Sequence, residues 1–171
     1  MKNNIMLIGF MGTGKSTVSR QLSKTTSRKE IDLDKYIEEY MGINIPDIFA
    51  KYGEDKFRDI ESECLKKVVS EEDAIISCGG GIVIRSENDY IMKENGTIVL
   101  LTAKPENIYD RVKNSTNRPV LNGNMNVEYI AGLLEKREPM YYRAAQLIIS
   151  TDDKNVEEIS REILDKIKKN S

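Results

Sequence analysis

The segment Gly9-Phe10-Met11-Gly12-Thr13-Gly14-Lys15-Ser16-Thr17 decides the fold. It matches the phosphate-binding loop pattern G-x-x-x-x-G-K-[ST], and it joins the apolar run Ile5–Ile8 to a segment of helical composition, Thr17–Lys24. In such a loop, glycines let backbone N–H groups surround phosphate oxygens, the lysine reaches the terminal phosphates and the serine binds Mg²⁺. The segment therefore predicts a nucleotide site whose contacts are Gly12, Thr13, Gly14, Lys15, Ser16 and Thr17.

Short apolar runs rich in Ile and Val alternate along the chain with longer segments of helical composition. This alternation is typical of a parallel sheet with helices on both faces. The expected strands are Ile5–Ile8, Glu30–Leu33, Ala74–Cys78, Thr97–Leu101 and Leu147–Ser150. The expected helices are Thr17–Lys24, Lys35–Met41, Pro46–Tyr52, Asp55–Val69, Glu87–Lys93, Pro105–Lys113, Val127–Lys136 and Val156–Lys168. A chain of 171 residues in this pattern predicts a single α/β domain spanning residues 1–171.

The composition restricts the chemistry and the partners. The 26 Lys and Arg residues against 28 Asp and Glu residues argue against a surface that coats nucleic acid. With no histidine and two cysteines, the usual zinc sites, Ser-His catalysis and a disulfide framework are excluded. The apolar runs are shorter than the roughly 18 residues of a membrane span. We therefore expect a cytoplasmic monomer without nucleic-acid or membrane partners, which uses carboxylates, lysine, arginine and backbone groups.

A carboxylate that holds the Mg²⁺ shell usually accompanies a phosphate loop. The later apolar strands end without an acid, whereas Asp32-Leu33-Asp34 stands at the end of the second expected strand. In an extended chain, the i, i+2 spacing places both carboxylates on one face. We therefore predict that Asp32 serves the metal and Asp34 the substrate. The alternative is that both acids face solvent and cap the following helix.

Gly79, Gly80 and Gly81 follow the expected strand that ends at Cys78. Glycines permit close approach of a ligand to the backbone, and ligands of open α/β sheets bind at the carboxyl ends of strands. The run is therefore a candidate binding loop, with a plain flexible turn as the alternative. Cys78 is interpreted as core filling, because nothing in the sequence indicates a lowered pKa.

Arg58 lies on an expected helix, with Glu54 four residues before it and Glu61 three residues after it. Either acid could hold the guanidinium so that its fork meets an anionic substrate. An ordinary surface ion-pair array is the alternative.

Two further arginines are candidates. Arg118 precedes a proline in the stretch of about residues 113–126, which lacks helical or strand periodicity and is a candidate lid loop. An arginine that closes over the transferred phosphate suits phosphoryl transfer, whereas a solvated loop charge is the alternative. Arg137 precedes Glu138-Pro139-Met140-Tyr141-Tyr142.

These segments occur in a specific order that resembles the shikimate kinase family. The matching segments are Gly9–Thr17, Asp32 with Asp34, Gly42–Phe49, Gly53-Glu54, Phe57-Arg58 with Glu61, Cys78–Gly81, Asn117-Arg118-Pro119, and Lys136-Arg137 with Pro139 and Tyr141. The resemblance covers most of the chain, about residues 5–145. It implies a nucleoside-monophosphate-kinase-like fold, with a five-stranded parallel sheet in the order 2-3-1-4-5 flanked by helices. It also implies ATP-dependent phosphorylation of the 3-hydroxyl of shikimate, in chorismate and aromatic amino acid biosynthesis.

On this resemblance, Lys15 and Ser16 look like the phosphate and Mg²⁺ contacts, and Asp32 looks like the carboxylate that organises the waters of the metal. Arg118 looks like the lid arginine, with a catalytic role beside that of Lys15. Arg111 looks like the residue that packs against adenine. The loop after the last strand shows no residue that identifies a further adenine contact.

The resemblance also indicates a substrate-binding segment of about residues 33–61. Asp34 resembles the residue that hydrogen-bonds the substrate hydroxyls and is the candidate base. Arg58 and Arg137 resemble the clamp on the shikimate carboxylate, and Gly79–Gly81 resemble its backbone contacts.

Parts of this pattern also occur in proteins of other functions. Another small-metabolite P-loop kinase, such as a gluconate kinase, or a nucleoside monophosphate kinase is the alternative among enzymes. The two arginines favour a monocarboxylate and Asp34 favours vicinal hydroxyls. A GTP-dependent switch would carry an Asn-Lys-x-Asp motif, which this sequence lacks.

Overall fold

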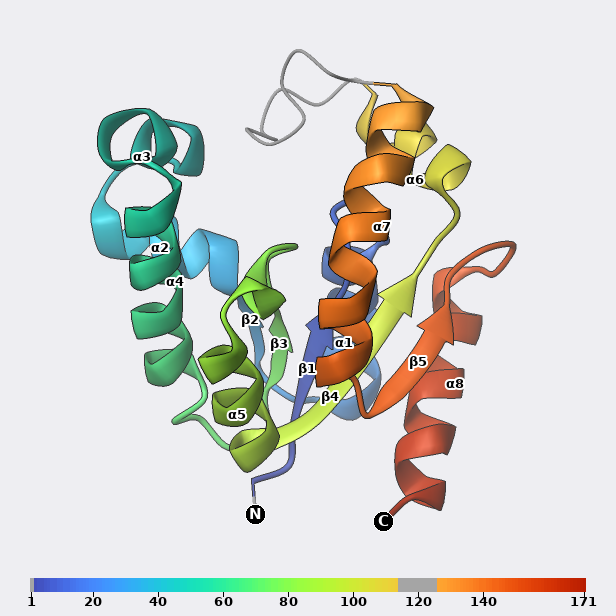
Figure 1. The fold of residues 1–171 in the computed structure, drawn as a ribbon. Helices are drawn as coiled ribbons and strands as arrows, with labels where there is room; N and C mark the ends of the chain where they lie inside the picture. Colours follow the sequence, from blue (N-terminus) through green and yellow to red (C-terminus); the bar gives the residue numbers. More distant parts are fainter. Residues whose placement is uncertain (1, 114–125) are drawn as a thin grey trace.

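The structure, a computed structural model, describes residues 2–113 and 126–171. It contains a five-stranded parallel sheet in the order β2-β3-β1-β4-β5, which confirms the predicted fold (Figure 1). The strands are β1 (Asn4–Ile8), β2 (Glu30–Asp32), β3 (Ile75–Ser77), β4 (Gly96–Thr102) and β5 (Leu147–Ser150). The helices are α1 (Lys15–Thr26), α2 (Leu33–Met41), α3 (Ile45–Tyr52), α4 (Glu54–Val68), α5 (Ser86–Asn95), α6 (Pro105–Val112), α7 (Val127–Ala144) and α8 (Val156–Lys169), with a 3₁₀ turn, η1 (Ile82–Ile84).

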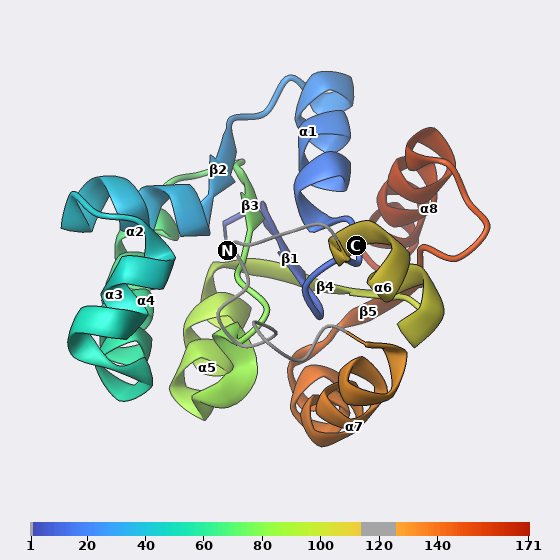
Figure 2. The ribbon, with the colours of Figure 1, turned by 90° about the horizontal axis from the view of Figure 1, so that it is seen from above.

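Helices cover both faces of the sheet, as Figure 2 shows, with α1 and α8 on one side and α5 and α7 on the other. Alternating side chains of β1 supply the two cores, because successive residues of a strand point to opposite faces. Ile5 and Leu7 pack in the core beneath α1 and α8, whereas Met6 and Ile8 pack in the core on the other face. The apolar stripe of α8 contacts the first of these cores, as its spacing predicts.

Several boundaries differ from the sequence prediction by a few residues, and two of these differences have a clear physical cause. The second strand ends at Asp32 instead of Leu33, because the Asp32 side chain accepts a hydrogen bond from Lys35 N–H and caps α2. Helix α7 continues to Ala144 through Pro139, although a proline removes one backbone donor and usually ends a helix. Tyr141 and Ala144 are buried beyond the proline, and their packing explains why the helix persists.

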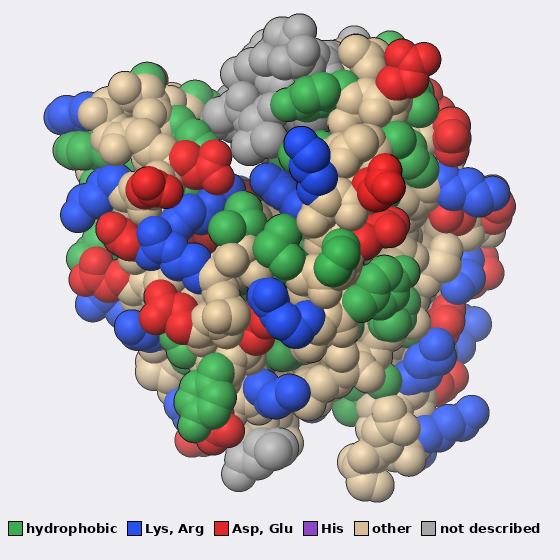
Figure 3. Space-filling view, in the orientation of Figure 1, with side chains coloured by type: hydrophobic (Ala, Val, Ile, Leu, Met, Phe, Trp, Pro, Cys, Tyr) green, Lys and Arg blue, Asp and Glu red, His purple; other side chains and the backbone are tan. Residues whose placement is uncertain are grey.

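The carboxyl ends of the strands lie at the edge of the sheet opposite the two chain termini (Figure 1). The face seen in Figure 3 carries interspersed acidic and basic side chains, with no broad area of one sign. Within the described residues, none of the helices has the length and apolar character needed to cross a membrane. Ligands of open α/β sheets bind at the carboxyl ends of the strands, so we expect a site at that end of the sheet.

Candidate active site

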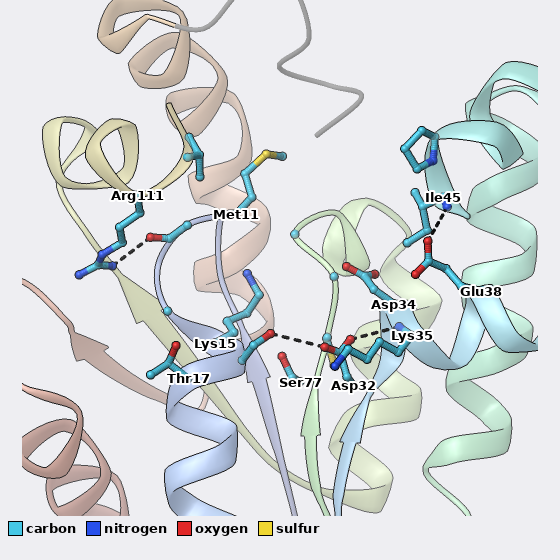
Figure 4. A pocket seen from close by; sticks show the side chains of 18 residues that line it. Met11, Lys15, Thr17, Asp32, Asp34, Lys35, Glu38, Ile45, Ser77 and Arg111 are labelled. Carbon is cyan, nitrogen blue, oxygen red and sulfur yellow. Dashed lines mark hydrogen bonds between the residues drawn. The ribbon is translucent and has the colours of Figure 1, made fainter. Parts of the chain in front are cut away.

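A cavity of about 370 Å³ lies at the carboxyl ends of β1, β2 and β3 (Figure 4). Its walls come from the phosphate loop, from α2, from the segment after β3 and from α6. The candidate residues that line it are Gly12, Gly14, Lys15, Ser16, Thr17, Asp32, Asp34, Gly79, Gly80 and Arg111. Four other candidates, Thr13, Arg58, Gly81 and Arg137, are absent from this lining, and the three of them with side chains are buried.

The phosphate loop turns sharply between β1 and α1. Gly12 and Gly14 have φ values of 81° and 97°, which L side chains rarely adopt. No side chain of the described residues caps the N-terminus of α1, so its first amide groups are available to an anion. The largely buried Lys15 Nζ donates to the carbonyls of Gly9 at 2.7 Å and Phe10 at 3.0 Å. The segment thus forms an anion cradle in which the lysine is held against the loop.

The two candidate metal residues are neighbours across the cavity. Ser16 Oγ lies 3.5 Å from Asp32 Oδ2, although the two come from α1 and from the end of β2. Both supply oxygen, which Mg²⁺ prefers, and Mg²⁺ is commonly held by one or two protein oxygens together with substrate phosphates. The donor set therefore fits Mg²⁺ bound next to a nucleotide.

Asp34 lies in the first turn of α2 and not in an extended strand. The prediction that Asp32 and Asp34 share one face of an extended chain was wrong, because the helix begins at Leu33. Both acids nevertheless line the same cavity. They do so because Asp32 ends the strand facing Ser16 while the first helical turn directs Asp34 toward Gly79.

Arg58 is buried in α4, where acids flank it as the sequence predicts. Its guanidinium lies 3.0 Å from Glu61 and 3.5 Å from Glu54. Glu61 is itself only 1% exposed, and this burial raises its pKa to about 7, although the Arg58 charge and hydrogen bond lower it. An ordinary surface array is therefore excluded for the Arg58–Glu61 pair, which fixes the guanidinium inside the protein.

The three glycines after β3 accommodate the polar side chains that surround them. A methyl group at Gly79 would lie 2.8 Å from Asp34 Oδ1, and one at Gly81 would lie 2.3 Å from Arg58 Nη1. Both distances are shorter than any normal contact, so the carboxylate and the guanidinium occupy the space of the missing side chains. The run is consequently a packed junction, and the alternative of a plain flexible turn does not fit it. The adjacent Cys78 is buried, as expected for core filling.

Arg137 reaches the same junction from α7. Its guanidinium lies 5.6 Å from the centre of the Phe10 ring, and the residue is 5% exposed. Within the described residues its Nη1 has no hydrogen-bond partner, and a methyl group at Gly80 would lie 3.6 Å from this atom. A buried donor without a partner is costly, which favours a ligand acceptor at this point.

Arg111 lies on α6 at the opposite side of the phosphate loop. Its Nη1 donates to the Gly12 carbonyl at 2.9 Å and to Thr151 Oγ1 at 3.4 Å. Arg111 therefore lies beside the phosphate loop, next to the place where a nucleotide would bind. Arg118 and nearly all of the expected lid, residues 114–125, lie outside the described residues.

Two buried residues beside the cavity, Glu61 and Tyr141, are not among the site residues predicted from the sequence. The sequence indicates Glu61 as an anchor of Arg58 and Tyr141 only as part of a motif. The signal for Glu61 is its i+3 spacing from Arg58, and that for Tyr141 is its i+4 spacing from Arg137. Neither spacing tells whether a side chain is buried, so the sequence does not distinguish these two residues from exposed neighbours on a helix.

Comparison with known proteins agrees with this geometry. The family model described as shikimate kinase matches residues 11–168. A shikimate kinase of Dehalococcoides mccartyi is 43% identical over 168 residues, covering 98% of this chain and 95% of the relative. The structure of a shikimate kinase from Acinetobacter baumannii in complex with shikimate superposes with a TM-score of 0.95 at 33% identity, covering 100% and 96% of the two chains.

A gluconokinase from Sinorhizobium meliloti is also similar, with a TM-score of 0.60 at 14% identity over 96% of this chain and 90% of the other. At that identity the likeness extends to the fold alone. The family model and the relatives, in contrast, match nearly the whole chain at far higher identity, including the segments that form the cavity. The chain belongs to the shikimate kinase family.

Proposed function

We propose that this protein transfers the γ-phosphoryl group of ATP to the 3-hydroxyl of shikimate. ATP-dependent phosphorylation of shikimate is the activity of the family. The observation that carries the proposal is that a phosphate loop and two buried arginines lie together at the carboxyl ends of the strands. The phosphate loop suits a nucleoside triphosphate, and the arginine pair suits a small carboxylate that also bears hydroxyl groups.

The phosphate loop is proposed to hold ATP through the backbone of residues 12–17. Lys15 exchanges its two carbonyl contacts for the terminal phosphates and meets the charge that develops on the transferred group. Arg111 packs against the adenine, which its position beside Gly12 supports. Arg118 is proposed to close over the phosphates.

Ser16 and Asp32 would hold Mg²⁺, Ser16 directly and Asp32 through the waters of the metal. The ion, when bound, neutralises phosphate charge. The contact between Ser16 Oγ and Asp32 Oδ2 supports this assignment because it brings the two oxygens to one place. Asn at position 32 would keep the cap on α2 while removing the charge, so the two roles of Asp32 can be separated.

Shikimate is proposed to lie between α2, α4, the glycine segment and α7. Its carboxylate meets Arg58, Arg137 and the backbone of Gly79–Gly81, and Asp34 binds the hydroxyl groups and accepts the proton of the attacking one. The substrate-binding segment is about residues 33–61. The close packing of Asp34 on Gly79 and of Arg58 on Gly81 supports a single compact subsite.

A coupled assay of ADP release tests the function, with shikimate, gluconate and nucleoside monophosphates compared at equal MgATP. We expect turnover with shikimate and less than about one-hundredth of that rate with the others. A nucleoside monophosphate has no carboxylate for the arginine pair, and the open chain of gluconate does not hold its hydroxyl groups as the ring of shikimate does. Faster turnover of gluconate than of shikimate would refute the proposal.

We further propose that the enzyme works as a cytoplasmic monomer without nucleic-acid or membrane partners. Its reaction consumes ATP, and both cysteines are free and buried, which suits a reducing compartment. Light scattering coupled to gel filtration tests the monomer, for which we expect a mass near 19.5 kDa.

A further inference from the structure

Tyr141 lies where three parts of the site meet. It is 2% exposed and belongs to α7, one helical turn after Arg137. Its hydroxyl donates a hydrogen bond to the Gly80 carbonyl, and it lies near enough to the Arg137 guanidinium for that positive charge to lower the pKa of the phenol. Tyr141 also lines a small pocket together with Phe10, which lies at the start of the phosphate loop. One hydroxyl group therefore bonds the glycine segment and lies near an arginine of the substrate clamp.

The bond to Gly80 fixes a stretch of main chain that has no side chains of its own. Glycine backbone is unusually free, so the direction of these peptides depends on outside contacts. In a trans peptide, the carbonyl of one residue points opposite to the N–H of the next. Holding the Gly80 carbonyl toward α7 therefore also sets the direction of the Gly81 N–H.

The Arg137 guanidinium has both Phe10 and Tyr141 as neighbours. It lies over the Phe10 ring, and its positive charge is near enough to the Tyr141 hydroxyl to lower the pKa of that group. The Nη1 atom stays without a partner among the described residues and lies beside Gly80. Tyr141 thus leaves one nitrogen of Arg137 open next to the main chain that it orients.

The hydroxyl keeps its proton over the whole working range of pH. Burial raises the pKa of Tyr141 to about 12, although the nearby Arg137 guanidinium lowers it. The bond to Gly80 is therefore that of a neutral donor, and its effect does not depend on pH near neutrality.

We propose that Tyr141 is a positioning residue for shikimate, whose hydroxyl holds the Gly80–Gly81 peptide and the Arg137 guanidinium in the orientation that receives the substrate carboxylate. The inference rests on the proposed function. It assigns Tyr141 no contact with ATP, so its effect falls on one substrate only.

Tyr141→Phe tests the proposal, because it removes the hydroxyl and keeps the ring that fills the core. We expect KM for shikimate to rise about 10-fold while KM for MgATP changes less than about 2-fold, as for the loss of one buried hydrogen bond. The matched control is Tyr142→Phe, the next residue on α7, which is 51% exposed and should leave both values unchanged. Equal rises in both KM values, or no rise for shikimate, would overturn the proposal.

A double-mutant cycle separates positioning from a general loss of stability. In an Arg137→Lys background, Tyr141→Phe should raise KM for shikimate less than about 3-fold, because the guanidinium that the hydroxyl orients is already gone. The same 10-fold rise in both backgrounds would contradict the orientation of Arg137. Replacing Tyr141 by 4-aminophenylalanine, which restores a donor at the ring, should return KM to within about 3-fold of the parent value; a value like that of Tyr141→Phe would count against the bond to Gly80.

The parent protein keeps the two proposals distinguishable. If it turns over shikimate and Tyr141→Phe behaves like the parent, only the role of Tyr141 falls. If the folded parent binds ATP without turning over shikimate, the proposed function falls, and the role of Tyr141 falls with it. Circular dichroism and thermal melting of each variant establish that it is folded before its kinetics are compared.

Discussion

The two halves of the cavity are built in different ways. The phosphate half comes from one continuous segment, residues 9–17, and relies on main-chain geometry and the N-terminus of α1. The substrate half is assembled from α2, α4, the segment after β3 and α7, and relies on buried polar side chains that pack on glycines. A substitution in the phosphate half should therefore affect only the contacts of the substituted residue. In the substrate half, a substitution in one helix or loop should also displace side chains that belong to the neighbouring elements.

The largest effect is expected in the phosphate half, from Lys15→Met. The substitution removes the cation that meets the developing charge and should lower kcat by at least about 10²-fold. It should leave cooperative unfolding intact, because the two carbonyl groups that Lys15 bonds, those of Gly9 and Phe10, belong to its own loop. Single-turnover and steady-state kinetics measure the loss. A kcat within about tenfold of the parent value would contradict the role of the loop lysine.

Gly81→Ala should be nearly as damaging, although it adds only a methyl group. The new carbon would lie 2.3 Å from Arg58 Nη1, while the backbone φ of −103° suits alanine. The guanidinium must therefore leave its place beside Glu61, and we expect kcat/KM for shikimate to fall about 10²-fold. KM for ATP should change little, and equal damage to both substrates would show that the halves are not independent.

The matched control is Gly132→Ala in α7, where an added methyl group has no atom within 4 Å. Alanine in an open helical position should raise stability slightly, by about 0.5–1 kcal/mol, and leave the kinetics unchanged. Urea unfolding of both variants separates the steric effect at Gly81 from a general effect of replacing glycine.

The same contrast explains which features the sequence could predict. The phosphate loop and the order of the elements follow from local patterns and from the resemblance, because their determinants are adjacent in the chain. The contact of Tyr141 with Gly80 joins residues 61 positions apart, and no periodicity encodes it. Whether Glu61 is buried depended equally on packing, since α4 carries many charges on both exposed and buried faces.

Local rules also failed where tertiary contacts decide. A proline predicts the end of α7 near residue 136, yet the buried residues beyond it hold the helix to Ala144. The spacing of Asp32 and Asp34 predicts a shared face in a strand, yet the cap made by Asp32 starts a helix between them. The predicted function survived both errors because the cavity gathers side chains from different local structures.

Exchange of either clamp arginine for lysine should act on shikimate alone. Arg58→Lys or Arg137→Lys should each raise KM for shikimate about 10-fold, because an ammonium group cannot form the bidentate fork. The double variant should cost less than the product of the two single effects, since both groups share one ligand. Strict additivity, or a main effect on KM for ATP, would mean that the arginines do not form one clamp.

A smaller and conditional effect is expected from Asp32→Asn. The asparagine oxygen can still accept from Lys35 N–H, so α2 keeps its cap while the metal loses a charge. At limiting Mg²⁺ the rate should fall several-fold, and raising Mg²⁺ should restore most of it. Asp34→Asn is the comparison, because its defect should persist at any Mg²⁺ concentration. Identical Mg²⁺ titrations for the two variants would contradict the division of roles.

The smallest expected effect concerns the pH dependence of stability in the substrate half. Burial raises the pKa of Glu61 from 4.5 to about 7, so between these values the folded protein retains a proton that the unfolded chain has lost. Stability from this group is therefore full below about pH 4.5 and is lost as pH rises through about 7. Glu61→Gln cannot titrate, and the unfolding free energy of the parent should fall relative to it by roughly 1–3 kcal/mol across this window. Urea unfolding of both proteins at several pH values measures the difference. A constant difference would mean that Arg58 keeps Glu61 ionised throughout, and the clamp would then rest on a permanent ion pair instead of a titrating one.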